Sequence, residues 1–225
     1  MEQISADIKV NVYEDNPDGY HAFQSFFLHG PLKQVPLLYN KIFETANLQA
    51  GQKVIEVGIG TGLNLSYYPD DIELYGIDLS PSMVETSKRQ LAEMNRKGEI
   101  HQGNAKDIQY PEGTFDVVVC IFVLCTIDDN KKALSELFRI CKPGGKIVLF
   151  DYHKANNETI LFDQQFMRET MSNGIIFQGK PVIVCDPLYD LDNAKKDLPH
   201  NVLFDEHLER SFSASFRATV LEKPS

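Results

Sequence analysis

Three glycines at alternate positions, Gly58, Gly60 and Gly62, follow an apolar run that carries one acidic residue, Glu56. The apolar run predicts a buried parallel strand, and the glycines allow a tight turn and close approach of a ligand to the backbone. A second acidic residue, Asp78, closes another apolar run 20 residues beyond Gly58. This interval places its carboxylate at the tip of the next strand, where it can accept hydrogen bonds from two ribose hydroxyls. We therefore expect a nucleoside-containing cofactor.

The spacing of the glycines separates the possible nucleosides. A dinucleotide fingerprint, Gly-x-Gly-x-x-Gly, seats a pyrophosphate on a helix N-terminus. Here the third glycine comes one residue earlier, and nothing resembling a P-loop lysine follows, which counts against a nucleoside triphosphate. The triplet alone is also compatible with an ordinary tight turn that binds no ligand, so the other segments decide.

The segment from Glu56 to Gly62 resembles motif I of the class I S-adenosylmethionine (SAM) methyltransferases. In that family the loop lies against the amino-acid part of SAM and binds no phosphate. Four later segments resemble the family's following motifs in the same order: residues 76–83, 103–105, 115–120 and 139–149. The resemblance covers residues 50–150.

The resemblance implies a role for each matched residue. Glu56 and the three glycines form the methionine side of a SAM pocket, and Asp78 holds the ribose. The residues implied to frame the adenine or line the pocket beside it are Leu79, Met83, Asn104, Ala105 and Ile121. Asn104 stands where the family commonly has Asp, and its amide oxygen can still accept a bond from the adenine amino group. The implied cofactor is S-adenosyl-L-methionine, with S-adenosyl-L-homocysteine (SAH) as product.

Short sequence segments narrow the resemblance to a branch of the family that acts on small molecules. The glycine loop is similar to bacterial phosphatidylethanolamine N-methyltransferases. Residues 123–127, with His153 soon after the fifth strand, are similar to thiol methyltransferase-like proteins and to quinone C-methyltransferases. The chain differs from membrane-associated relatives in having no N-terminal hydrophobic anchor and no basic amphipathic helix. A phospholipid acceptor is therefore a weaker expectation than a small molecule.

The elements that position these residues follow from alternating strand and helix patterns, which predict an α/β, Rossmann-like fold with helices on both faces of a mostly parallel sheet. We expect strands at 53–57, 73–78, 99–101, 116–121 and 145–151, and helices at 62–67, 81–96 and 130–141. Ser80 and Pro81 indicate a helix start, and Gly98 is expected to end that helix. The runs 201–208 and 211–221 are typical of the antiparallel hairpin that completes a seven-stranded methyltransferase sheet.

The 225 residues are expected to form a single domain. Residues 1–50 are predicted to be a helical cap, 51–153 the SAM-binding core, and 154–225 the substrate side with the last strands. The resemblance implies that residues 10–30 fold over SAM as a lid, and packing into the core is the alternative. We also expect a helix at 157–173, a strand at 181–185 and a short helix within 192–197.

Methyl transfer requires little of the protein beyond alignment of the acceptor with the methyl group. A methyl group on a sulfonium is already activated, so the enzyme must chiefly hold a nucleophile in line with it. A general base is needed only for an acceptor such as an alcohol. His153, Tyr20 and Asp128 are the catalytic candidates. For His153 and Asp128 the alternative is a surface or helix-capping role.

Composition excludes several functions. A net charge of −10 and a pI near 5.0 make nucleic acid an unlikely ligand by charge. Four widely separated cysteines and no histidine cluster give no metal-ligand spacing, so no metal is expected. No signal peptide or apolar run long enough to span a membrane is present, so we expect a cytoplasmic protein.

Three alternatives stay open from sequence. The chain is compatible with a monomer or a homodimer. It is also compatible with a non-catalytic SAM-binding regulatory or partner subunit, although an intact motif I and Asp78 argue against this. An NAD-type oxidoreductase on a similar sheet is disfavoured by the glycine spacing.

Overall fold

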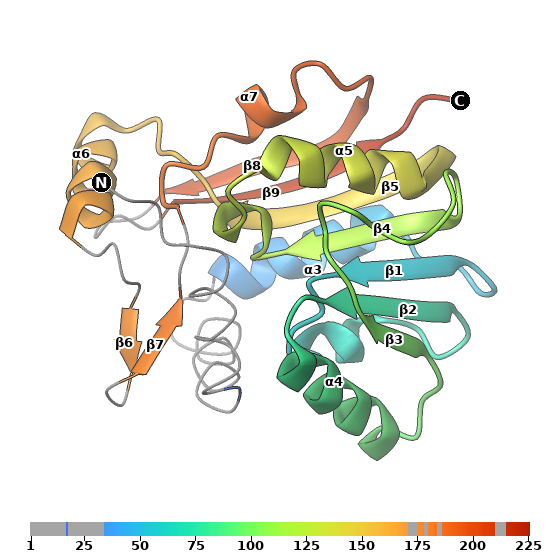
Figure 1. Cartoon of the computed structure of the whole chain (residues 1–225). Helices are drawn as coiled ribbons and strands as arrows, with labels where there is room; N and C mark the ends of the chain where they lie inside the picture. Colours follow the sequence, from blue (N-terminus) through green and yellow to red (C-terminus); the bar gives the residue numbers. More distant parts are fainter. Residues whose placement is uncertain (1–16, 18–33, 171–174, 178–179, 184–185, 210–214) are drawn as a thin grey trace.

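A seven-stranded sheet forms the centre of the protein (Figure 1). The computed structural model describes residues 17, 34–170, 175–177, 180–183, 186–209 and 215–225. Tyr20 and, apart from residue 17, the predicted lid at 10–30 lie outside the described residues. The strand order is β3-β2-β1-β4-β5-β9-β8. Strands β1 to β5 are parallel, and β9 pairs antiparallel with β5 and β8. The predicted Rossmann-like sheet with its C-terminal hairpin is confirmed.

The strands lie close to their predicted positions. Their bounds are β1 Lys53–Val57, β2 Glu73–Asp78, β3 Glu99–Gln102, β4 Phe115–Ile121, β5 Cys141–Tyr152, β8 Asn201–Glu209 and β9 Ser215–Glu222. A separate two-stranded sheet contains β6 Ile175–Phe177 and β7 Lys180–Ile183. Strand β5 begins earlier than predicted because Cys141 already pairs with Phe115 before the register shifts.

The helices differ from prediction at two places. Their bounds are α3 Gln34–Ala46, α4 Pro81–Glu93, α5 Asn130–Ile140, α6 Glu158–Thr170 and α7 Leu191–Lys195, with 3-10 helices η1 Leu63–Tyr67 and η2 Leu124–Thr126. The helix predicted at 62–67 is thus a 3-10 turn. Helix α4 ends before Gly98 because Asn95 takes the left-handed conformation, with φ 52°, that the glycine was expected to supply. Its start is as predicted, since the Ser80 side chain accepts from the Met83 amide.

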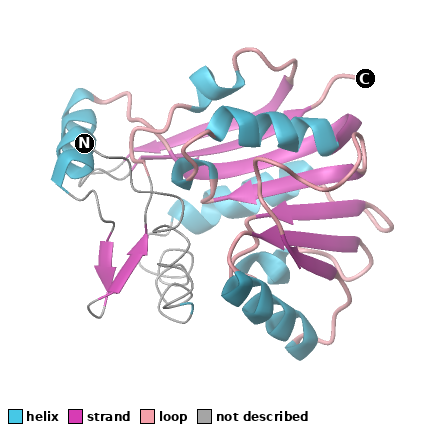
Figure 2. Cartoon of the chain, in the orientation of Figure 1, coloured by secondary structure: helices cyan, strands magenta, loops and turns pink. Residues whose placement is uncertain are grey.

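Helices cover both faces of the sheet (Figure 2). One face packs against α3, η1 and α4, and the other against α5 and α7. Side chains alternate along β1, so Ile55 and Val57 point toward the α5 face while Val54 points toward the α3 face. The same alternation turns Glu56 toward α3. Among the described helices, none has the length and apolar character needed to cross a membrane.

Candidate cofactor site

The carboxyl ends of β1 and β4 border a small pocket that is open to solvent. Ligands of open α/β sheets bind at this edge. The lining residues come from α3, β1, the glycine loop, η1 and the end of β4: Tyr39, Glu56, Gly58, Ile59, Gly60, Thr61, Leu63, Asn64, Ile121 and Phe122. The structure therefore brings together four predicted cofactor residues, Glu56, Gly58, Gly60 and Ile121.

The glycine loop needs its glycines for both conformation and space. Gly58, Gly60 and Gly62 have φ of 76°, 56° and 85°, a region that side-chain-bearing residues seldom adopt. A Cβ on Gly58 would also lie 2.2 Å from Cγ2 of Val123, which follows β4. The loop and the end of β4 can approach this closely only because Gly58 has no side chain.

Asp78 ties the glycine loop to the start of α4. Its Oδ2 accepts a hydrogen bond from the Gly60 amide at 2.8 Å, and its Oδ1 accepts from the Ser80 amide at 3.0 Å. The carboxylate is half-buried at the carboxyl tip of β2. This is the predicted place for a ribose-binding group, and the ribose contact itself stays a prediction.

The predicted adenine residues lie outside the pocket lining, apart from Ile121. Leu79 is exposed and Met83 is buried, whereas Ala105 is half-buried. Asn104 is exposed, and its Oδ1 accepts from the Lys106 amide at 2.9 Å. The amide oxygen that we expected to meet adenine is thus engaged in a local turn. The adenine roles of these residues stay predictions.

A buried hydrogen-bond network surrounds Glu56, whose side chain is turned toward α3. Its Oε1 accepts from Asn64 Nδ2 at 2.5 Å, and its Oε2 accepts from the Tyr68 hydroxyl at 2.8 Å. The Tyr39 hydroxyl in turn donates to Asn64 Oδ1. Burial raises the pKa of Glu56 to about 8, although the bonds from Tyr68 and Asn64 act in the opposite direction. Sequence reasoning missed Tyr39, Asn64 and Tyr68, because no motif joins them to Glu56.

Phe122 is a second residue that the motifs missed. It follows β4, lines the pocket and has φ 56°, which is unusual for a bulky side chain. Its amide donates to the Phe150 carbonyl at 2.7 Å, and its ring lies 5.0 Å from the Phe150 ring. Backbone held in sparsely populated conformations concentrates at functional sites. Only a structure could have identified this residue, since no sequence pattern marks a positive φ at a phenylalanine.

His153 is buried and both of its ring nitrogens are engaged. Its Nδ1 lies 2.7 Å from the Lys154 carbonyl, and its Nε2 lies 3.3 Å from Nη1 of Arg217. A carbonyl only accepts and a guanidinium only donates, so Nδ1 carries the proton and Nε2 accepts from Arg217. Burial, followed by the charge of Arg217, lowers the pKa of His153 to about 4. A catalytic role for His153 stays a prediction, and these contacts weigh against it.

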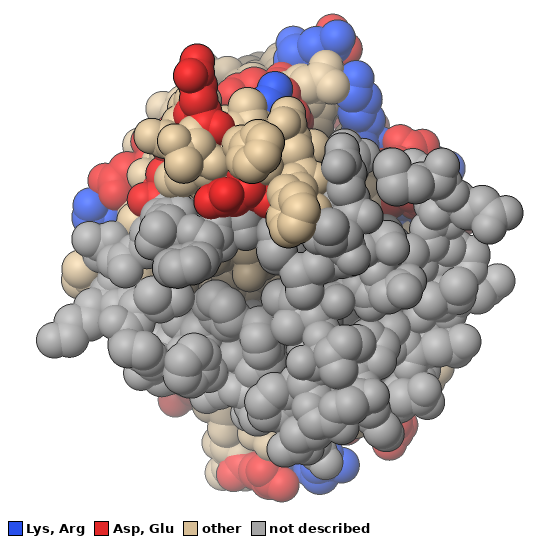
Figure 3. Space-filling model, turned by 90° about the vertical axis from the view of Figure 1, so that its left-hand side faces the viewer, with Lys and Arg blue, Asp and Glu red and all other residues tan. Residues whose placement is uncertain are grey.

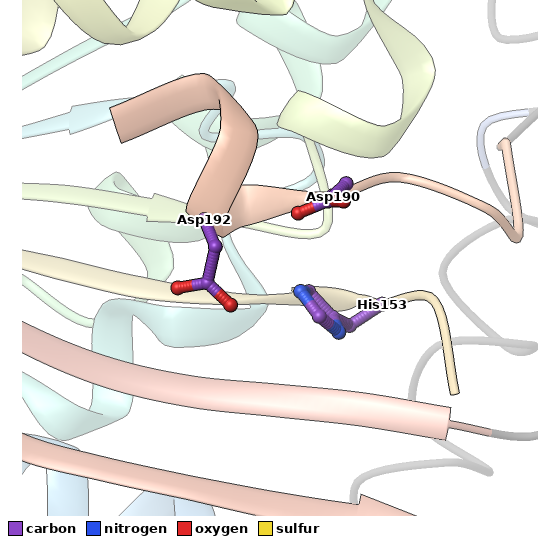
Figure 4. A group of neighbouring side chains, drawn as sticks. All are labelled: His153, Asp190 and Asp192. Carbon is purple, nitrogen blue, oxygen red and sulfur yellow. The ribbon is translucent and has the colours of Figure 1, made fainter. Parts of the chain in front are cut away.

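His153, Asp190 and Asp192 converge closely enough to suggest metal ligands (Figure 4). However, Arg217 Nη1 donates to Asp192 Oδ2 at 2.7 Å as well as to the histidine, and its Nε and Nη2 form a bidentate pair with Asp205. The guanidinium already supplies the positive charge at this cluster. We therefore assign it to structure rather than to a metal.

The other catalytic candidates are placed differently. Asp128 is exposed, and its Oδ1 accepts from the Asp129 amide and from Lys106 Nζ, each at 2.9 Å. The neighbouring Asp129, rather than Asp128, caps α5 by accepting from the Lys132 amide. A catalytic role for Asp128 stays a prediction, and Tyr20 lies outside the described residues.

Comparisons with known proteins agree with this geometry. Residues 55–149 match a family model described as a methyltransferase domain. Phosphatidylethanolamine N-methyltransferase of Cereibacter sphaeroides is 34% identical over 104 residues, 45% of this chain and 51% of that protein. The ubiquinone/menaquinone biosynthesis C-methyltransferase UbiE of Vibrio campbellii is 29% identical over 117 residues, 49% of this chain and 45% of that protein. The chain spans about half the length of these curated relatives.

Solved structures share the fold over a larger part of the chain. A chain from the Haloferax volcanii complex of the Trm112 methyltransferase activator with a methyltransferase superposes with a TM-score of 0.67. The match covers 99% of this chain and 100% of that one at 14% identity. At this identity the likeness shows the fold alone.

Proposed function

We propose that this chain is a class I S-adenosylmethionine-dependent methyltransferase, which binds SAM at the carboxyl ends of β1 and β2 and transfers the methyl group to a small molecule. One hydrogen bond carries the proposal. The Asp78 carboxylate, from the second motif, accepts directly from the Gly60 amide of the glycine loop. Residues that act on the ribose and on the methionine part of SAM thereby share one edge of the sheet.

The residues present fit the cofactor. The glycine loop offers backbone without side chains, and Asp78 offers a carboxylate at the strand tip. Glu56 supplies a buried carboxyl that lines the pocket on the methionine side, where a cationic ammonium would be held. Bound SAM supplies a methyl group on a sulfonium that needs no further activation. The protein's contribution is to exclude water and align the acceptor.

The acceptor is proposed to be a small molecule rather than a nucleic acid. Figure 3 shows the side of the molecule toward which β1, β2 and β4 point, and both acidic and basic side chains are visible among the described residues of its upper part. The net charge of −10 disfavours binding to a phosphate backbone. Phe122, an aromatic residue of the pocket lining, supports a planar or apolar acceptor, in keeping with the name of the UbiE relative. In this proposal residues 1–225 act as one domain, with residues 1–50 as the cap.

Calorimetry with SAH tests the cofactor assignment. We expect wild-type protein to bind SAH and Asp78→Asn to bind it at least tenfold more weakly, because one ribose hydrogen bond to a charged group is lost. Asp71→Ala is the matched control, since Asp71 is an exposed aspartate before the same strand. Equal affinity in wild type and Asp78→Asn would contradict the assignment.

The second candidate function is a SAM-binding subunit that does not itself catalyse. It shares the fold and the cofactor, so binding data do not separate it from the first. Methyl transfer does: a catalytic chain moves label from SAM into an acceptor, and a binding subunit retains SAM without transfer.

A further inference from the structure

Helix α3 reaches the cofactor pocket through one side chain. Tyr39 is 1% exposed and lines the pocket, although it lies outside the segment that resembles the methyltransferase motifs. Its ring packs at 5.6 Å from Phe150 and 5.0 Å from Tyr67. Its hydroxyl extends from this aromatic cluster to Asn64 Oδ1.

The direction of the hydrogen bonds gives Tyr39 a defined role. The Asn64 amide has one end that donates and one that accepts. Because Nδ2 donates to Glu56, Oδ1 must face Tyr39, and the tyrosine hydroxyl holds it there by donating. Without this hydroxyl the amide is able to rotate, and a rotated amide would present its oxygen to the Glu56 carboxylate. That arrangement loses a donor and, once Glu56 is ionised to hold an ammonium group, brings two acceptors together.

We propose that Tyr39 and Asn64 are positioning residues for the cofactor, which fix the Glu56 carboxylate for the ammonium group at the methionine end of SAM. The inference rests on the proposed function and extends it to α3. Tyr39 acts through Asn64, and Asn64 acts on Glu56. In the proposed function the adenosine end belongs to Asp78, which accepts from the Gly60 and Ser80 amides.

The affinities for two ligands distinguish a positioning role of Tyr39 from a packing role. SAH carries the amino-acid group, whereas 5′-methylthioadenosine has the same adenosine and thioether without it. We expect Tyr39→Phe to weaken SAH binding about five- to tenfold, as for loss of one buried hydrogen bond near a charge, and to leave 5′-methylthioadenosine binding unchanged. Tyr67→Phe is the control, because it removes a hydroxyl from the same aromatic cluster that bonds to none of the described residues. It should leave both affinities unchanged.

A double mutant tests whether Tyr39 acts through Asn64. Asn64→Ala should reproduce the selective loss of SAH affinity, and adding Tyr39→Phe to it should cause no further loss. Equal weakening of both ligands, additive losses, or unchanged SAH affinity in Tyr39→Phe would overturn the relay while leaving the proposed function intact. Absence of SAH binding by the wild-type protein would overturn both.

Discussion

At the scale of single residues, the glycine loop shows how backbone conformation and close packing combine. Gly58 has φ 76° and its missing side chain makes room for Val123, whereas Gly51 has the same φ and no atom within 4 Å of the place that a Cβ would occupy. The two glycines therefore separate a conformational cost from a steric one. Positive φ alone costs an alanine roughly 1–2 kcal/mol.

We expect Gly58→Ala to destabilise the protein by about 2–4 kcal/mol, since overlap with Val123 adds to the conformational cost. Gly51→Ala should lose only the roughly 1–2 kcal/mol that positive φ costs an alanine. Urea unfolding of both variants measures the difference. Equal losses in the two would show that the contact with Val123 is unimportant.

Glu56 carries a second prediction at this scale. With its pKa raised to about 8 by burial, it is largely protonated at pH 7 before the cofactor binds. An ammonium group favours the ionised form, so SAH binding at pH 7 should release close to one proton. Calorimetry in buffers of different ionisation enthalpy measures this release, and Glu56→Gln should abolish it. Proton release that persists in Glu56→Gln would assign the effect to another group.

At the scale of elements, Arg217 joins four of them. It extends from β9 to Asp205 on β8, to Asp192 on α7 and to His153 after β5. The arginine is 6% exposed, while the Asp192 side chain is 61% exposed. Buried charges that lose their partner cost far more than exposed ones. The cluster therefore holds α7 and the C-terminal hairpin against the sheet.

Substitution should reveal this difference in burial. Arg217→Met is expected to lower the free energy of unfolding by about 3 kcal/mol, because Asp205 loses a bidentate partner, and Asp192→Asn by less than about 1 kcal/mol. Chemical denaturation of the two variants compares them directly. A larger loss in Asp192→Asn would contradict the assignment of the main contact to Asp205.

His153 adds a pH dependence to the same cluster. Its pKa falls from 6.5 to about 4 on folding, so the unfolded chain binds the proton more readily between these values. Stability contributed by neutral His153 is therefore complete above about pH 6.5 and lost as the pH falls toward 4. The stability difference between wild type and His153→Gln should shrink over this range. A difference that is constant with pH would contradict the buried, neutral state.

At the scale of the whole molecule, the sequence predicted features that depend on neighbouring residues better than contacts between distant residues. The strands, the glycine turn and the Ser80 cap depend on neighbouring residues, and the structure agrees with them. The predicted end of α4 was wrong because Asn95, rather than Gly98, takes the left-handed conformation. The bonds from Tyr39 to Asn64 and from Arg217 to His153 span 25 and 64 residues. Folding alone brings such pairs together, so no spacing in the sequence indicates them.

Methyltransferase activity of this chain is tested by transfer of labelled methyl from SAM into an extract of the source cells. We expect label in a small, polar or moderately apolar product that separates from nucleic acid and lipid. Asp78→Asn protein should give little of this product at limiting SAM. Tight SAH binding by the wild-type protein without transfer of label to any fraction would contradict catalysis and establish the chain as a SAM-binding subunit.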